Sequence, residues 1–199
     1  MQPVRTYADF SSYFGGGGRL RATARDAVVL ALSIGRNIHR TSGWIRFPYY
    51  HHVFDDERHG FGHQLDYPRG FGEFISLDDV VGLRDSGETI AGCYFCITFD
   101  DGLKNCLTNG VPILLGKSAP AAFFMTTGYI DNDPEKNREK LLGFFDHGKA
   151  LMEFLSWQDC HDMARRRYDH RLAHSQSCPS HQMKRRRCAT RARDIKGDD

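Results

Sequence analysis

The sequence has little net charge, no long apolar run and no signal peptide. Its 27 Lys and Arg nearly balance 25 Asp and Glu among 199 residues, so the net charge of +2 gives no strong reason to expect binding to nucleic acid or to a membrane. The apolar stretch at residues 27–34 is far too short to span a bilayer, and the first twenty residues lack the charged-then-apolar order of a secretory signal. We therefore expect a soluble, cytoplasmic protein.

The cysteines do not form the regular framework of a small secreted domain. They are spread irregularly, at positions Cys93, Cys96, Cys106, Cys160, Cys178 and Cys188. Cys93 and Cys96 form a Cys-x-x-Cys pair, but no second pair follows at the spacing of a zinc ribbon. Because the pair lies in an apolar stretch, we expect two buried strand thiols rather than a metal or redox site.

Glycine content and charge divide the chain into three parts, with a single domain in the middle. Residues 1–45 are expected to hold a mobile leader, interrupted by four consecutive glycines, and a first element that is either a short helix or a buried strand. Residues 46–182 form the predicted domain. Residues 183–199 are a basic tail, expected to be solvated and poorly ordered, although such a tail can also bind polyanions.

The first half of the predicted domain contains one strand and two helices. A strand is expected within residues 48–53, and apolar residues at helical spacing predict a helix within residues 57–67. A second helix is expected to begin at Ser76, with acidic residues in its first turn, and to stop at Gly87.

The second half of the domain predicts a parallel sheet. A buried strand within residues 92–102 is followed by a helix that Pro112 must open or interrupt, and then by a second strand within residues 121–130. This order is a βαβ unit, which places functional groups at the carboxyl ends of parallel strands. Residues 140–169 are expected to be mostly helical, with Ser156 capping the last helix.

Two adjacent carboxylates follow the first of these strands, in the stretch "ITFDDG" at residues 97–102. Asp100 and Asp101 would lie at the ligand-binding edge of the sheet, and neighbouring residues point to opposite sides. One carboxylate can therefore face a metal ion while the other faces a water or a substrate atom. The structural alternative is that Asp100 caps the next helix and Asp101 is solvated.

A second group of metal-ligating side chains lies in the stretch "HSQSCPSH" at residues 174–181. If a helical turn begins at His174, then Cys178 and His181 lie on the same side of it, and Asp101 could close a three-ligand site with a place left for water. Mixed nitrogen, oxygen and sulfur ligands suit zinc. The structural alternative is that these histidines lie at the surface.

These stretches together resemble the polysaccharide deacetylase family, the carbohydrate esterases with a chitooligosaccharide deacetylase homology domain. The similarity runs from about Tyr49 to His181 and rests on "ITFDDG", "APAAFFMTTGYI", "LSWQDCHDMARRRYD" and "AHSQSCPSH". The stretches "YYHHVFDDERHGF" and "FGEFISLDDVV" are similar to the segment that often precedes the deacetylase core in bacterial members.

The resemblance implies a role for each candidate residue. Asp100 corresponds to the catalytic base, Asp101 to a metal ligand and His174 to the first histidine of the family's H-[S/T]-x-x-H motif. Cys178 stands where the second histidine is expected, and His181 is the alternative third ligand. The implied cofactor is a divalent metal, with zinc favoured; a thiolate ligand would make that metal a weaker Lewis acid.

The resemblance also implies a fold and a function. The fold is α/β, a partial (incomplete) β/α barrel of the polysaccharide deacetylase type, because too little chain follows Gly102 to close a barrel of roughly 200 residues or more. The function is metal-dependent removal of acetyl groups from an N-acetylated or O-acetylated polysaccharide or oligosaccharide. The alternative is a non-catalytic carbohydrate-binding or degenerate remnant of a deacetylase.

Two further expectations follow from the incomplete barrel. The family's mechanism uses a histidine from a late motif to protonate the departing amine, and no late motif is visible in this sequence. An open half-barrel also leaves sheet edges and an apolar face uncovered, so the chain is expected to be marginally stable and to self-associate. The implied partner is acetylated carbohydrate, with no nucleic acid and no membrane span.

Overall fold

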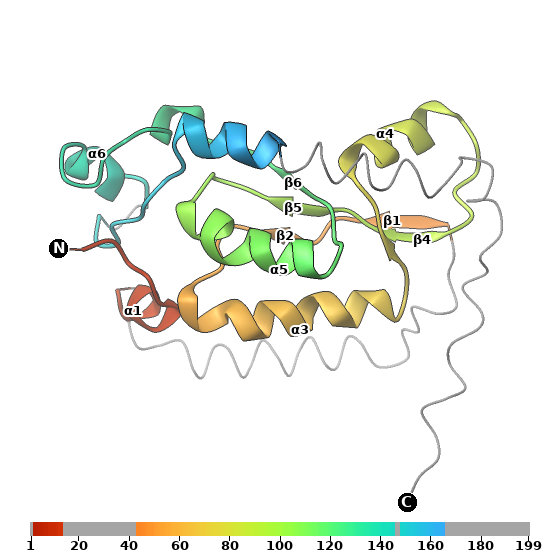
Figure 1. Ribbon diagram of the computed structural model, residues 1–199, viewed down its shortest axis with the longest axis horizontal. Coiled ribbons are helices and arrows are strands. Elements are labelled where there is room, and N and C mark those ends of the chain that lie inside the picture. Colours follow the sequence, from red (N-terminus) through yellow and green to blue (C-terminus); the bar gives the residue numbers. More distant parts are fainter. Residues whose placement is uncertain (1, 14–42, 146–147, 166–199) are drawn as a thin grey trace, which may run out of the picture.

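The fold is a parallel sheet covered by helices, seen in a computed structural model that describes residues 2–13, 43–145 and 148–165 (Figure 1). The strands form two ladders of three, in the orders β1-β4-β3 and β2-β5-β6, and every pair is parallel. The strands are β1 (Trp44–Arg46), β2 (Tyr49–Tyr50), β3 (Glu73–Phe74), β4 (Cys93–Phe95), β5 (Ile97–Phe99) and β6 (Ala121–Phe123). The α/β class with a parallel sheet is therefore confirmed.

The two ladders continue one another along the same chain segments. Only Cys96 separates β4 from β5, and its N–H donates to the Arg46 carbonyl. Two residues further on, the Thr98 N–H donates to the Pro48 carbonyl. The segment of β1 and β2 therefore stays hydrogen-bonded to the segment of β4 and β5 across Cys96. The "DDG" stretch, residues 100–102, follows at the carboxyl end of the second ladder.

The predicted βαβ unit is confirmed. β5 leads through a π-helical turn, η3 (Cys106–Gly110), and helix α5 (Val111–Gly116) to β6, which pairs with β5. Pro112 lies in the first turn of α5, where its missing N–H removes no helical hydrogen bond. The proline therefore opens the helix rather than interrupting it.

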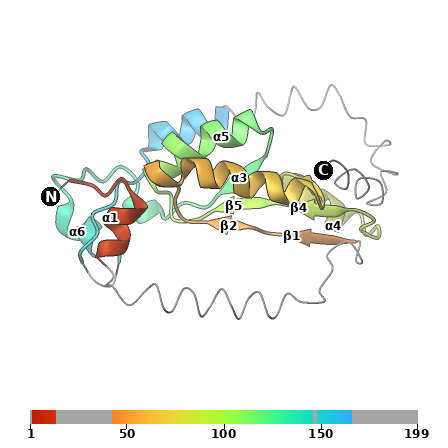
Figure 2. The ribbon, with the colours of Figure 1, turned by 90° about the horizontal axis from the view of Figure 1, so that it is seen from below.

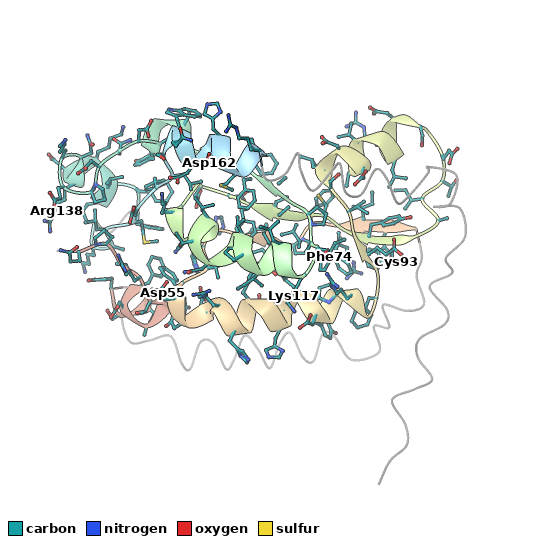
Figure 3. The ribbon with its side chains drawn as sticks, in the orientation of Figure 1. Asp55, Phe74, Cys93, Lys117, Arg138 and Asp162 are labelled. Atoms are coloured by element: carbon teal, nitrogen blue, oxygen red, sulfur yellow. The ribbon has the colours of Figure 1, made fainter. Side chains whose placement is uncertain are left out.

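Cys93 and Cys96 are buried, as predicted from their apolar surroundings. Figure 3 labels Cys93 on β4 together with Phe74 on the neighbouring strand β3, and the register pairs Phe74 with Phe95. These side chains belong to the amino-terminal half of the sheet, away from the carboxyl end that follows β5.

The helix predicted after the first strand is α3 (Arg58–Arg69), which follows a short 3₁₀ turn, η2 (Asp55–Glu57). It buries Phe61 and Leu65, which are four residues apart and so share one face. In both ribbon views α3 and α5 run along the same face of the sheet (Figures 1 and 2). Lys117, labelled in Figure 3, joins the end of α5 to α3 with its Nζ 2.5 Å from an Asp66 carboxylate oxygen.

The second predicted helix is α4 (Leu77–Asp85), and its ends are as expected from the sequence. The Ser76 hydroxyl accepts the Asp79 N–H, and the Asp79 carboxylate accepts the Ser76 N–H. These reciprocal bonds satisfy two N–H groups that the helix itself leaves without partners. Gly87, with a φ of 63°, follows the helix in the left-handed conformation that favours glycine.

The N-terminal residues differ from the expected mobile leader. Residues 7–12 form helix α1 (Tyr7–Ser12), and its first N–H groups, from Tyr7 and Ala8, donate to the Asp56 carboxylate. Val4 and Phe10 pack against the main core. This contact could not be predicted because Asp56 is far along the chain. The glycine run and the apolar stretch at residues 27–34 lie outside the described residues.

The region predicted to be mostly helical contains a long non-helical segment. Helix α6 (Arg138–Leu142) is short, and residues 150–156, called the strap below, are not helical. The apolar side chains of the strap are buried, and Phe154 forms an isolated bridge with Leu103. The expectation was wrong here because a run of buried apolar residues suits an extended segment as well as a helix. A helix does occupy residues 157–165, with Ser156 as its cap, as predicted.

The hydrophobic core fills the space between the sheet, α3 and α5 and extends under the strap. Its fully packed members are Val53, Phe54, Phe61, Leu65, Ile97, Phe99, Leu103, Cys106, Leu114, Ala119, Leu141, Leu151, Met152 and Phe154. At its centre the Phe99 ring stacks on Tyr50 and Phe123, with centroids 5.4 Å and 4.9 Å away. Strand β5 is thus held by side chains from both neighbouring strands. No helix among the described residues is long and apolar enough to cross a membrane.

Candidate functional site

Asp100 and Asp101 lie directly after β5, at the carboxyl end of the sheet. The Asp100 N–H donates to the Tyr50 carbonyl at 2.9 Å, which extends the β2–β5 ladder by one residue. Asp101 and Gly102 then have φ angles of 74° and 78°. Two successive left-handed residues turn the chain sharply out of the strand, and aspartate is one of the few side chains that accepts this conformation.

His51 contacts the Asp101 carboxylate, and sequence analysis had missed this residue. Its Nδ1 lies 3.0 Å from Asp101 Oδ2. A carboxylate oxygen accepts in such a contact, so His51 Nδ1–H is the donor. The His51 side chain is 49% exposed and that of Asp101 28% exposed, so both reach solvent. The site therefore contains an oriented imidazole beside two carboxylates.

The adjacency of two strands explains why His51 reaches Asp101. His51 follows β2, Asp101 comes two residues after β5, and these strands are neighbours with Tyr50 opposite Phe99. Side chains that follow neighbouring parallel strands meet at one edge of the sheet. Both strands were predicted from the sequence, but their pairing was not. Without that pairing, His51 could not be placed beside Asp101.

Hydrogen bonds from distant segments fix the turn that carries Asp101. The Asp101 carbonyl accepts the Thr126 N–H at 3.3 Å, and the Gly102 carbonyl accepts the Leu155 N–H of the strap at 3.0 Å. A side chain on Gly102 would also meet Met125, whose sulfur lies 3.0 Å from the Cβ position. The turn is thus enclosed by the segment after β6 and by the strap.

Lys104 connects the same turn to the last described helix. Its N–H donates to the Glu153 carbonyl of the strap, and its Nζ lies 2.5 Å from an Asp159 carboxylate oxygen. Burial opposes ionisation of Asp159, but hydrogen bonds from Lys104 and Ser156 outweigh burial and lower the pKa of this carboxyl. Asp159 is therefore ionised at neutral pH and can both cap the helix and pair with Lys104.

Cys106 supports His51 from below the surface. Its Sγ lies 3.2 Å from the His51 carbonyl oxygen and donates to it. Burial, with the Asp101 charge adding to it, raises the pKa of the Cys106 thiol to about 12. A thiol that stays protonated is a poor nucleophile and a poor metal ligand. Cys106 therefore contributes a hydrogen bond to the backbone that carries His51.

His52, the neighbour of His51, makes a different set of contacts. Its Nδ1 lies 3.1 Å from Glu57 Oε2, and its ring lies against Phe10 and Phe54, with centroids 5.6 Å and 4.5 Å away. Burial opposes ionisation of Glu57, but hydrogen bonds from His52 and from the Phe54 N–H lower the pKa of this carboxyl. Of the two adjacent histidines, only His51 contacts the candidate site.

The described residues supply one of the predicted metal ligands, Asp101. Within the described residues, no group of three His, Cys, Asp or Glu side chains could hold a metal ion. Asp101 Oδ1 accepts no hydrogen bond from any described residue, so it can ligate a divalent ion while Oδ2 stays paired with His51. The predicted ligands His174 and Cys178, and the alternative His181, lie outside the described residues.

A parallel α/β sheet with carboxylates and a histidine at its carboxyl end defines a class of ligand-binding site common in α/β enzymes. The sequence profile of polysaccharide deacetylases matches residues 91–186, which contain both aspartates and all three predicted ligands. This part of the chain is therefore similar to the polysaccharide deacetylase family. No curated protein matches the sequence.

Several solved structures are similar to part of this chain. IcaB from Ammonifex degensii is 21% identical with a TM-score of 0.50, over 63% of this chain and 49% of that chain. The BpsB deacetylase domain from Bordetella bronchiseptica is 19% identical with a TM-score of 0.46, over 61% and 50% of the two chains. A de-N-acetylase from Aggregatibacter actinomycetemcomitans is 16% identical with a TM-score of 0.45, over 61% and 50%. The chain spans about half the length of these structures.

Proposed function

We propose that this protein is a metal-dependent hydrolase that removes acetyl groups from N-acetylated or O-acetylated carbohydrate. The observation that carries the proposal is the 3.0 Å contact between His51 and Asp101, directly beside Asp100, within a deacetylase-family sheet. Hydrolysis of an amide or ester needs a base for the attacking water and an acid for the leaving group. This edge of the sheet supplies a carboxylate and an imidazole that can fill these two roles.

Asp100 is the base in this proposal. Its carboxylate takes a proton from the water that attacks the acetyl carbonyl carbon. It is half-buried and has no side-chain hydrogen bond to another described residue, so it is available to a water molecule. The carbon–nitrogen or carbon–oxygen bond to the sugar then breaks, and acetate is released.

His51 is the proton donor in this proposal. In this proposal Nδ1–H stays hydrogen-bonded to Asp101 Oδ2. The other nitrogen, Nε2, takes up a proton and transfers it to the departing amine or alkoxide. The same carboxylate stabilises the protonated ring. An imidazole that follows β2 would then perform the step that sequence analysis assigned to a histidine from a late motif.

A divalent ion, most simply zinc, is the proposed cofactor. Asp101 Oδ1 would hold it together with His174 and with Cys178 or His181. When bound, such an ion polarises the acetyl carbonyl and lowers the pKa of a bound water.

We also propose that the sheet is part of an incomplete β/α barrel of the polysaccharide deacetylase type. Support comes from the all-parallel pairing and from the helices α3 and α5 along one face of the sheet. An open barrel would leave strand edges available for association with another copy.

The test is acetate release from acetylated oligosaccharides, measured with and without added Zn²⁺. We expect activity in the parent, loss in Asp100→Asn and in His51→Ala, and no change in the control His161→Ala, which removes an exposed histidine outside the site. Zinc content after dialysis should fall in Asp101→Asn and His174→Ala and stay in Asp100→Asn. Cys178→His should keep zinc and accept a wider range of metals. A parent that binds the oligosaccharides but releases no acetate would instead identify a carbohydrate-binding remnant.

A further inference from the structure

Two histidines outside the candidate site lie one helical turn apart on α3. The Nε2 atoms of His59 and His63 are 3.2 Å apart, and the two rings meet edge to face with centroids 4.4 Å apart. Both side chains are exposed. Neither residue contacts Asp100, Asp101 or His51, so the proposed deacetylase chemistry does not use this pair.

The helix holds the pair on its outer face. Phe61 and Leu65 have the same four-residue spacing and are buried, which anchors α3 against the sheet. Successive helical residues are turned by about 100°, so positions 59 and 63 lie roughly opposite these anchors. The backbone that carries the two imidazoles is therefore fixed by core packing, while the imidazoles themselves face solvent.

The separation of the two nitrogens suits two ligands of a single metal ion. Metal–nitrogen bonds of about 2.0–2.1 Å, at angles between about 90° and 110°, place the two nitrogens about 2.8–3.4 Å apart. The observed 3.2 Å lies within that range. Without a metal the same two atoms lie at hydrogen-bond distance, so an ion that binds both replaces that contact.

We propose that His59 and His63 form a second metal site, separate from the proposed catalytic ion, for a divalent transition metal that prefers imidazole, such as Ni²⁺, Cu²⁺ or Zn²⁺. Water completes the coordination, because no third donor joins the pair among the described residues. Asp66, the next carboxylate along α3, pairs through Oδ1 with Lys117. The bound ion links two successive turns of the helix and stabilises α3.

The experiment is a Ni²⁺ titration of the untagged full-length protein by calorimetry. We expect His59→Ala and His63→Ala each to weaken this site by about a hundredfold, because the second imidazole then no longer binds intramolecularly. The control His161→Ala should bind like the parent. Asp101→Asn should also keep the site, which separates it from the proposed catalytic ion. A His59→Ala protein that binds as much Ni²⁺ as the parent, with the same affinity, would overturn the proposal.

A second variant tests the geometry rather than the number of histidines. His63→Gln combined with Gln64→His keeps both imidazoles but places them five residues apart, where they no longer share a face. This protein should bind Ni²⁺ as weakly as the single variants. Ni²⁺ should raise the melting temperature of the parent by more than that of the rearranged protein, since only the native helix presents the pair. Equal affinity in the rearranged protein would show that the observed spacing is irrelevant.

Discussion

The two halves of the parallel sheet are built with very different amounts of packing. In the half made of β2, β5 and β6, Phe99 lies between Tyr50 and Phe123 and is almost completely buried. In the half made of β1, β4 and β3, the adjoining helix α4 buries none of its residues. Trp44 there packs against Phe95 and under the Arg46 guanidinium. The first half is fixed by a shared core, and the second depends more on local contacts.

The candidate site lies on the heavily packed half. Asp100 and Asp101 extend from β5, and the turn that they begin is bonded to the strap and to the segment after β6. Reacting groups must be held within a fraction of an ångström, which requires support from the residues behind them. The dense packing and the candidate site therefore occupy the same half of the sheet.

The largest expected effect is on turnover. Asp100→Asn should lower acetate release by about 100-fold to 10,000-fold, since the base is lost, with little change in stability. The matched control in the other half is Asp85→Asn, which removes an exposed carboxylate of α4 and should leave turnover unchanged. Initial rates on the same oligosaccharide measure both. Similar rates in the two variants would remove the assigned role of Asp100.

The next effect is on the free energy of unfolding. Phe99→Ala should cost about 3–5 kcal/mol, because it leaves a cavity in the central aromatic stack. Phe74→Ala, in the half-buried position of β3, should cost less than half as much. Urea unfolding followed by circular dichroism gives both values. If both substitutions cost the same, the two halves of the sheet do not differ in packing.

The burial of Cys106 should make the free energy of unfolding depend on pH under alkaline conditions. Its pKa is about 12 in the folded protein against 9.0 for an ordinary thiol, so between these values the unfolded chain loses the proton while the folded chain keeps it. Stability should therefore fall with rising pH in that window, by about 1.4 kcal/mol per pH unit at most from this group. Cys106→Ala should show a shallower decline over the same range. Parallel declines in the two proteins would mean that the thiol is not buried.

The smallest expected effect is on the stability and activity of variants at two glycines with positive φ angles. Gly102→Ala and Gly87→Ala should each cost about 1–2 kcal/mol, because alanine is strained at a positive φ. At Gly102 the added methyl also meets Met125, whereas nothing lies within 4 Å at Gly87. We therefore expect only Gly102→Ala to reduce acetate release as well. An equal loss of activity in both would break the link between the turn and the site.

Local signals in the sequence predicted much of the fold. The four-residue spacing of Phe61 and Leu65 predicted α3, and Ser76 predicted the start of α4. A helix opened or interrupted by Pro112 was predicted where α5 begins. Each of these features depends on residues within one or two helical turns. Such features can be predicted from the sequence because the physical cause and its effect are close together in the chain.

Contacts between distant segments could not be predicted. Helix α1 depends on Asp56, and the buried conformation of the strap depends on the bridge between Leu103 and Phe154. His51 was missed for the same reason, because its relation to Asp101 requires knowledge of which strands are neighbours. The positions of both aspartates after β5 followed from the sequence, while their chemical roles stay predictions.

The left-handed backbone at Asp101 has a consequence for how this protein can evolve. Asparagine and glycine also accept that conformation, and each is one nucleotide change away from an aspartate codon. A single mutation can therefore remove the carboxylate while the turn and the packing of β5 remain. At this position the proposed metal ligand and the fold are therefore separable, so a lineage can lose the carboxylate and keep the folded sheet.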